Sequence, residues 1–241
     1  MKWLLSLMLM SLGVPLKAAD TLRPGTVLPV RLERGLNARK VKPGQAVNGR
    51  VMQDVPGTPI RRGAKVVGHV VGAAPPASGK GAQISLRFET VEAKKERFQV
   101  KTDLRALASM TEVADAQVPA SGPDRGTSEY AWATTQIGGD VVYRGGGPVA
   151  RGLEVVGEPA PHGALGRLRS DPWKPCRGVV DANDQSQALW LFSGDACGIY
   201  GYPNVKIQHA GRTDPIGEIV LESESGNLAI EGGSGWLLRV Q

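Results

Sequence analysis

The sequence predicts a mainly β protein. It has an N-terminal barrel- or sandwich-like β module, a second β-rich domain with one disulfide, and one short helix between them. Three observations support this fold class. Apolar and polar residues alternate between Gly or Pro turns from Gly25 to Val71. The 241 residues include 32 glycines and 17 prolines, which is typical of many short strands joined by turns. Apolar residues show helical spacing in one stretch only.

Residues 1–18 have the layout of a secretory signal peptide. Lys2 gives a positive start, Trp3–Leu16 is apolar, and the small residues Ala18 and Ala19 follow. The apolar run of about 14 residues is shorter than the roughly 20 that cross a bilayer as a helix. We expect cleavage after Ala18, with an uncleaved anchor as the alternative. The chain is therefore predicted to be extracytoplasmic, either periplasmic or secreted, with no stable transmembrane span after cleavage.

Residues 19–113 are expected to form the N-terminal β module. Pro29 cannot donate a hydrogen bond to a neighbouring strand, so its strand is predicted to lie at a sheet edge. The Val-rich third strand is predicted to be buried on both faces, and the last two strands to form a hairpin. The five expected strands are Val27–Leu32, Ala46–Val55, Ala64–Gly72, Gln83–Thr90 and Arg97–Thr102.

A helix is predicted over Asp103–Val113, where Leu104 and Leu107 fall at helical spacing and Asp103 can cap the first turn. Residues 114–128 are rich in Ala, Pro, Gly and Ser and are interpreted as a linker.

Residues 129–241 are expected to form the second β-rich domain. This part holds four of the five tryptophans, all four tyrosines and both cysteines. Apolar runs between turns predict several short strands, and the last three are expected to pair as a meander. The expected strands are Tyr130–Ile137, Gly139–Tyr143, Leu153–Val156, Ala164–Leu168, Ala188–Ser193, Pro203–Gln208, Gly217–Glu222, Leu228–Glu231 and Trp236–Val240.

Cys176 and Cys197 are predicted to form a disulfide, because exported proteins favour oxidised cysteines. The bond would close a loop of about 20 residues and contribute on the order of 3 kcal/mol in the chain-entropy model. The alternative is a reactive thiol at Cys197, which would need His162 or His209 beside it. The two cysteines do not have the Cys-x-x-Cys spacing of redox proteins.

The sequence contains no recognisable metal or cofactor motif. His69, His162 and His209 are isolated from one another, without the spacing of a zinc site. The glycine loop 144–148 lacks the Gly-Lys-Ser/Thr ending of a phosphate-binding loop and is interpreted as a turn. We therefore expect no bound metal or cofactor.

The candidate ligand contacts are Trp173, Tyr200 and Tyr202, aromatic residues near turns that could stack on a sugar. The chain carries a formal net charge of +6, a mild excess that is compatible with anionic envelope polymers or lipid. Arg61, Arg62 and Lys65 form a small basic cluster. It is either a solvated turn or a contact for an acidic polymer.

Two resemblances bear on the fold. Gly25–Leu32 (GTVLPVRL) and Ile60–Gly68 (IRRGAKVVG) are similar to two strands of the β-barrel module in the scaffold subunit of conjugation and type IV secretion channels. Arg61 stands where that family has Pro, and this resemblance implies fold only. A larger part of the chain resembles an uncharacterised group of exported bacterial proteins, which implies export and a β-rich build but no activity. The segments that carry it are SLRFETV, LRALASM, TTQIGGDVVYRGGG, DACGIYG and HAGRTDPIGEI.

These observations together predict a non-catalytic, extracytoplasmic, envelope-associated binding or assembly protein. Its partner would be an envelope polysaccharide or another envelope protein, and the sequence shows no nucleic-acid-binding motif. One alternative is a cell-wall or polysaccharide hydrolase, which would need acids such as Asp181, Asp184 or Asp195 in an aromatic cleft. Another is a glycan-binding module.

Overall fold

The structure is a computed structural model, and it describes residues 20–94, 96–118, 132–139, 141–144, 149–151, 153–160, 163–166 and 189–241. The predicted signal peptide lies outside these ranges and stays a prediction. Within the described ranges, no helix is both long enough and apolar enough to cross a membrane.

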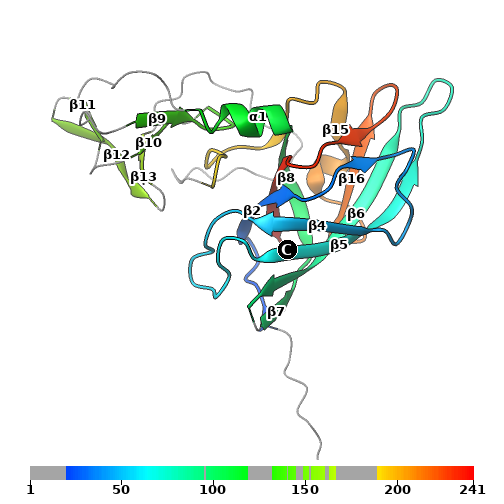
Figure 1. The fold of residues 1–241 in the computed structure, drawn as a ribbon, viewed down its shortest axis with the longest axis horizontal. Helices are drawn as coiled ribbons and strands as arrows, with labels where there is room; N and C mark the ends of the chain where they lie inside the picture. The colour runs from blue at the N-terminus through cyan, green and yellow to red at the C-terminus, as the bar shows by residue number, and fades with distance from the viewer. Residues whose placement is uncertain are drawn as a thin grey trace, which may run out of the picture.

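One large mixed sheet of eleven strands forms the body of the molecule (Figure 1), so the mainly β prediction is confirmed. Its main path runs in the order β1-β7-β6-β5-β4-β2-β18-β8-β14, and β16 pairs with both β6 and β15. The strands are β1 (Asp20–Thr21), β2 (Val27–Leu32), β4 (Ala46–Val51), β5 (Lys65–Ala74), β6 (Gln83–Ala93), β7 (Glu96–Gln99), β8 (Thr102–Ala108), β14 (Gly198–Tyr200), β15 (Val205–Ile207), β16 (Glu218–Ser223) and β18 (Gly235–Val240).

The sheet curls around an apolar core. Trp236 lies at its centre, fully buried, with its ring edge-on to Phe88 at a centroid distance of 5.9 Å. Ile84, Leu86 and Phe88 of β6 are buried while their neighbours are not, as the alternation predicted. The hairpin of β6 and β7 is also confirmed. Period-two patterns thus identified both strands and their inward faces.

The edge position predicted for Val27–Leu32 is wrong, because β2 lies between β4 and β18. Pro29 is tolerated there for a local reason. Its carbonyl accepts a hydrogen bond from the Met52 N–H (2.8 Å), so its nitrogen faces the same side, just past the last residue of β4. The bond that Pro29 cannot donate would therefore fall beyond the end of β4, and its loss does not interrupt the pairing of β2 with β4.

The helix predicted over Asp103–Val113 is mostly wrong. Residues up to Ala108 form β8, and the helix α1 covers only Met110–Asp115, with Ser109 rather than Asp103 as its cap. The cause is a bulge: Leu104 pairs with Leu238 and Ala106 with Leu237, which leaves Arg105 as an extra residue. The bulge brings Leu104 and Leu107 to the same inward face, and this imitates helical spacing.

The strand predicted over Ala64–Gly72 exists as β5, but it is not buried on both faces. Val66 and Val70 are fully buried, whereas Val67 and His69 are partly exposed. A run of valines therefore does not distinguish a strand with one covered face from a strand with two.

Strands near the C-terminus complete the sheet begun by the N-terminal half. β18 pairs with β2 and β8, and β16 pairs with β6. A separate two-stranded pair joins β17 (Ala229–Ile230) to β3 (Leu36–Asn37). The expected meander is therefore wrong in its pairing, although its three strands exist. The strand pairing also crosses the predicted linker at residues 114–128, so residues on both sides of it share one sheet.

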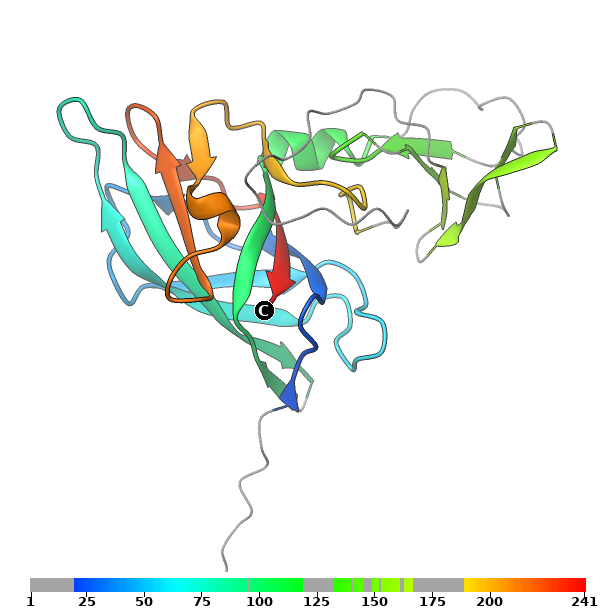
Figure 2. The same ribbon diagram turned by 180° about the vertical axis from the view of Figure 1, so that it is seen from behind.

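A smaller five-stranded sheet lies to one side of the large sheet, beyond α1 (Figure 2). Its order is β11-β12-β13-β10-β9, with every pairing antiparallel. The strands are β9 (Trp132–Thr135), β10 (Val141–Arg144), β11 (Val149–Arg151), β12 (Glu154–Ala160) and β13 (Gly163–Gly166).

Candidate functional site

The outer face of β2, β4 and β5 carries three positively charged residues side by side. The strand register pairs Arg31 with Arg50 and Arg50 with Lys65. We call Arg31, Arg50 and Lys65 the cationic row. The same line continues across the sheet, where Lys65 pairs with Glu92 and Glu92 pairs with Arg97.

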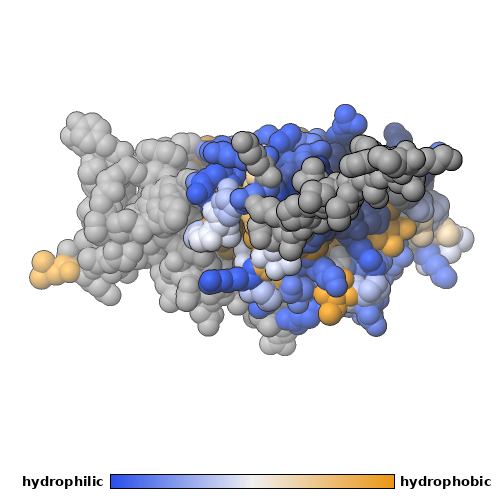
Figure 3. Space-filling view, turned by 90° about the horizontal axis from the view of Figure 1, so that it is seen from below, coloured by the Kyte–Doolittle hydropathy of each residue, from blue (hydrophilic) through white to orange (hydrophobic). Residues whose placement is uncertain are grey.

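The cationic row is open to solvent. Arg31 and Arg50 are exposed and Lys65 is half-buried, while the residues beside them in each strand point into the core. Neighbouring strands lie about 4.8 Å apart, so the three residues fall within about 10 Å. The surface seen from below in Figure 3 is predominantly hydrophilic over the described residues, with scattered hydrophobic patches.

The charges of the row are only partly neutralised within the described part of the chain. Arg50 Nε lies 2.6 Å from Glu33 Oε1, and Arg97 lies 3.1 Å from Glu92 further along the line. Arg31 and Lys65 have no ion pair with any described residue. Like charges directly opposite one another destabilise a sheet, so an external anion bound there would relieve repulsion along the row.

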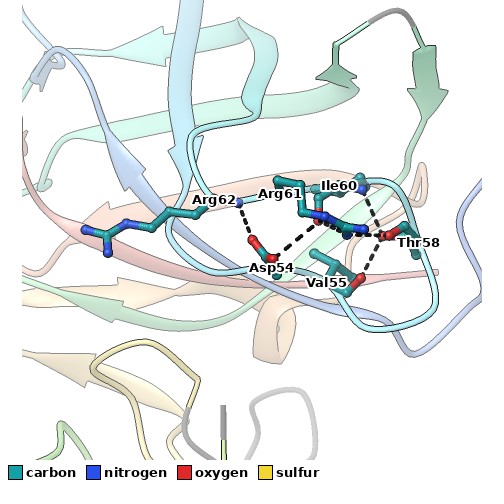
Figure 4. A network of polar contacts seen from close by, with 6 residues as sticks. All are labelled: Asp54, Val55, Thr58, Ile60, Arg61 and Arg62. Atoms are coloured by element: carbon teal, nitrogen blue, oxygen red, sulfur yellow. Dashed lines mark hydrogen bonds and ion pairs between the residues drawn. The ribbon is translucent and has the colours of Figure 1, made fainter. Parts of the chain in front are cut away.

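The loop between β4 and β5 adds Arg62 at this end of the sheet, a cation that forms no ion pair with a described residue (Figure 4). Arg61 is held inside the loop, since its Nη1 donates to the Thr58 carbonyl at 2.7 Å and its Nε lies 3.7 Å from Asp54 Oδ2. Arg62 donates only its backbone N–H to Asp54 Oδ1 (2.8 Å), and its side chain extends away from this network. The predicted basic cluster is thus divided: Arg62 and Lys65 face outward, while Arg61 holds the loop together.

The outer face of β8 and β18 is covered, in contrast to that of β2, β4 and β5. Helix α1 and residues 189–196, which include Phe192, lie over it and form a second apolar core together with Leu237 of β18. Arg105, only 1% exposed, donates through Nη2 to the Gly194 carbonyl beneath this cover. Burial, reinforced by the charge of Arg239, lowers the pKa of Arg105.

The strand predicted over Ala188–Ser193 is wrong. Leu189 and Phe192 are bridged across a tight turn in which Trp190 adopts a positive φ of 58°. The turn is held from both sides, because the Gln53 side chain accepts the Trp190 N–H and the Gln136 side chain reaches the Trp190 carbonyl. These residues therefore form a cap over the sheet rather than a strand within it.

Of the three predicted ligand-contact residues, the structure describes Tyr200 and Tyr202. Tyr200 is 4% exposed, and its hydroxyl accepts the Cys197 N–H at 3.2 Å. Burial raises the pKa of Tyr200 to about 12. Tyr202 is half-buried, its hydroxyl accepts the Glu231 N–H at 3.3 Å, and burial raises its pKa as well. Trp173 lies outside the described residues. The expectation that Tyr200 is a surface residue is wrong, because it belongs to the second core.

Cys197 is buried, and the described part of the chain contains no free cysteine. Cys176 lies outside the described residues, so the Cys176–Cys197 disulfide stays a prediction. Mass analysis of the unreduced protein that found two free thiols would refute it.

The residues considered for metal binding or catalysis are not gathered into one centre among the described residues. His69 Nδ1 lies 3.1 Å from Glu89 Oε2 on the outer face. No group of His, Cys, Asp or Glu suited to hold a metal ion occurs in the described ranges. Three of the residues considered lie outside those ranges: His162, Asp181 and Asp184. The hydrolase alternative depends on acids such as these two aspartates, so it stays a prediction.

Sequence reasoning missed the cationic row because its members stand far apart in the chain. Each of them is an outward-facing cation of a strand, and for Arg31 this was visible in the alternation of β2. The missing information was the register, which depends on the order of strands in the sheet and on the length of each loop.

No family model matches the chain, and neither the curated proteins nor the solved structures include a protein that matches it. The resemblances to the secretion-channel scaffold and to the exported bacterial group therefore stay predictions.

Proposed function

We propose that the protein is a non-catalytic, extracytoplasmic binding protein of the cell envelope. Its open sheet face would dock on a polymer or surface that carries repeated phosphate or carboxylate groups. The observation that supports this proposal is the cationic row, in which Arg50 lies between Arg31 and Lys65 and is the only one of the three that forms an ion pair with a described residue.

The side chains of the row are suited to bind a molecule that carries several anionic groups in a line. Guanidinium groups bind phosphate and carboxylate through two parallel hydrogen bonds, and an ammonium group adds a point charge. An anionic chain lying across β2, β4 and β5 would meet a cation at each strand. Binding of this kind weakens with ionic strength, because the row is exposed and screened by salt.

The proposal is tested with two probes that carry the same chemistry from different sources. One is inorganic polyphosphate in solution, and the other is vesicles containing phosphatidylglycerol, with neutral phosphatidylcholine vesicles as reference. The double variant Arg31→Gln/Lys65→Gln should bind the preferred probe at least tenfold more weakly than wild type at about 50 mM salt. The preferred probe identifies whether a polymer or a lipid surface supplies the anion.

The matched control is Arg39→Gln/Lys80→Gln, which removes the same two charges at exposed positions outside the row. It should change the affinity less than twofold. An equal loss in both double variants would show that net charge alone drives binding, and the absence of wild-type binding to either probe would refute the proposal.

A further inference from the structure

A groove of about 270 Å³ opens where β2 and β4 stop pairing. The two strands pair as far as the backbone bond from the Glu33 N–H to the Asn48 carbonyl, which is 2.9 Å long. Beyond this bond the chain turns away from β4, and Leu36 pairs with β17 instead. The groove lies in the resulting gap, between residues 34–36 on one side and residues 45–48 on the other.

The turn that forms one wall of the groove is fixed by a close approach of two backbones. A Cβ at Gly35 would lie 2.8 Å from the Ile230 carbonyl oxygen and 3.2 Å from the Gly232 nitrogen. Any side chain at Gly35 would therefore push the turn away from β17. The other wall belongs to a strand of the sheet, so backbone determines the width of the groove on both sides. The groove is thus preformed, as ligand sites usually are.

The groove has an apolar floor and a polar rim. Leu36 and Val47 line it, although they are only 3% and 2% exposed and belong to the main core. Asn48 is half-buried and points to the opposite face of β4 from Val47, since neighbouring residues of a strand alternate. Arg34 and Gln45 are exposed. Polar side chains therefore surround the opening through which a solute would enter.

These polar side chains have hydrogen-bonding capacity that the described part of the chain does not use. Gln45 Oε1 accepts one long bond, from the Lys42 N–H at 3.4 Å. The Gln45 amide nitrogen and the Asn48 side chain form no hydrogen bond with a described residue. Arg34 forms no ion pair with one either. A ligand in the groove would not have to displace a protein partner from any of these groups.

The groups around the groove match a sugar ring that carries an acid. An amide side chain offers two donors and an acceptor, and a sugar hydroxyl both donates and accepts. A guanidinium binds a carboxylate or a phosphate through two parallel hydrogen bonds. Arg34 is the one charged residue among the described residues that line the groove. The volume lies just below the range of about 300–1,000 Å³ that is typical of sites for larger ligands, so it suits a single sugar unit.

The groove adjoins the cationic row. Asn48 precedes Arg50 by two residues on the same face of β4, so about 7 Å separate them along the strand. Glu33, which pairs with Arg50 at 2.6 Å, directly precedes Arg34 on the other wall. A chain of acidic sugars with one unit in the groove would therefore bring the acid groups of its next units to the row.

We propose that this groove selects the ligand of the cationic row, and that the ligand is an acidic polysaccharide whose sugar rings bear carboxylate or phosphate groups. One ring occupies the groove and forms hydrogen bonds with Asn48 and Gln45, while its acid group pairs with Arg34. The acid groups of the following rings pair with the cationic row. This inference rests on the proposed binding of anionic groups, and it names a sugar polymer as the preferred source of those groups.

Two probes separate the groove from the row. A short oligogalacturonate carries both sugar hydroxyls and carboxylates, whereas inorganic polyphosphate carries charge without sugar. Asn48→Ala should weaken the binding of oligogalacturonate about fivefold or more, as expected for the lost hydrogen bonds of one amide, and should change polyphosphate binding less than about twofold. Retained polyphosphate binding also shows that the variant is folded.

NMR titration of the isotope-labelled full chain locates the sugar. The side-chain amide signals of Asn48 and Gln45 should shift with oligogalacturonate and stay in place with polyphosphate. The control Asn204→Ala removes an exposed amide outside the groove. It should bind both probes as wild type does.

Failure of the groove and failure of the row give different results. If Asn48→Ala changes the binding of both probes equally, or of neither, the groove does not select a sugar, and the row is unaffected. Wild-type binding to polyphosphate or to phosphatidylglycerol vesicles without binding to oligogalacturonate would overturn the groove in the same way. Unchanged binding of both probes by Arg31→Gln/Lys65→Gln would instead overturn the row, and with it the selection proposed for the groove.

Discussion

Charged side chains have opposite environments on two parts of the same sheet: exposed on one part and buried on the other. On the outer face of β2, β4 and β5, Arg31 and Arg50 stand in solvent beside Lys65. On the outer face of β8 and β18, Arg105 is 1% exposed beneath α1 and the segment that contains Phe192. The two parts meet at Gly235, which pairs with Arg31 on one side and Ala108 on the other.

Gly235 lies directly beneath the cover. A Cβ at this position would lie 3.0 Å from Val113 Cγ2 and 3.1 Å from Phe192 Cζ. The cover thus lies over β18 at the position opposite Arg31, and on β2 it contacts Val27 at the other end of the strand. A charged residue on this sheet therefore supports the fold where the cover lies over it. Where the cover is absent, the charged residue is available to a ligand.

The largest expected effect concerns the cover itself. Phe192→Ala should lower the free energy of unfolding by about 3–5 kcal/mol, because a fully buried ring leaves a cavity between α1 and β18. Urea denaturation measures the change. The control Ile216→Ala, at a position 60% exposed, should stay within about 0.5 kcal/mol. Similar losses in both variants would contradict the distinction between covered and open faces.

Arg105 tests whether the buried charge is needed or only its volume. Arg105→Ala should cost about 3 kcal/mol, since it empties the space below Gly194 and removes the buried donor to its carbonyl. Arg105→Met, which fills much of that space without a charge, should recover most of the loss. If urea unfolding shows Met to be as costly as Ala, the guanidinium itself holds the cover in place.

Alkaline pH should loosen the covered side through Tyr200. Its pKa is about 12 in the folded protein because of burial, against about 10 for an exposed tyrosine. The folded state thus retains the phenol proton that the unfolded state loses, so stability falls as pH rises from about 10 to 12, by about 2–3 kcal/mol in total. Tyr200→Phe should reduce this fall in urea unfolding measured at pH 8, 10 and 11. An unchanged pH profile would show that Tyr200 does not titrate as proposed.

The smallest expected effect is on the open side. Lys65→Gln should change the free energy of unfolding by no more than about 0.5 kcal/mol, and in the stabilising direction, because it relieves repulsion from Arg50. The gain should shrink as salt is added. A loss of more than about 1 kcal/mol would mean that Lys65 supports the fold, and the row would then be a poor candidate for a ligand site.

The sequence predicted elements well where local pattern determines them. The alternation of Ile84, Leu86 and Phe88 identified β6 and its inward face. Prediction from the sequence failed where pairing with distant strands determines the structure. The bulge at Arg105 produced a spacing like that of a helix, and the tolerance of Pro29 inside the sheet depends on where β4 ends. The candidate site required register across three strands, which no local pattern contains.

The central position of β18 has a consequence for how the molecule assembles. Residues 235–240 pair with β2 and β8 at once, so these two strands cannot be joined until residues 235–240 have been synthesised. A ribosome halted before residue 235 would leave two long apolar edges open, and such edges readily associate with other chains. The sheet is therefore joined across its middle by β18, and this joining is a long-range event in folding rather than growth from the N-terminus.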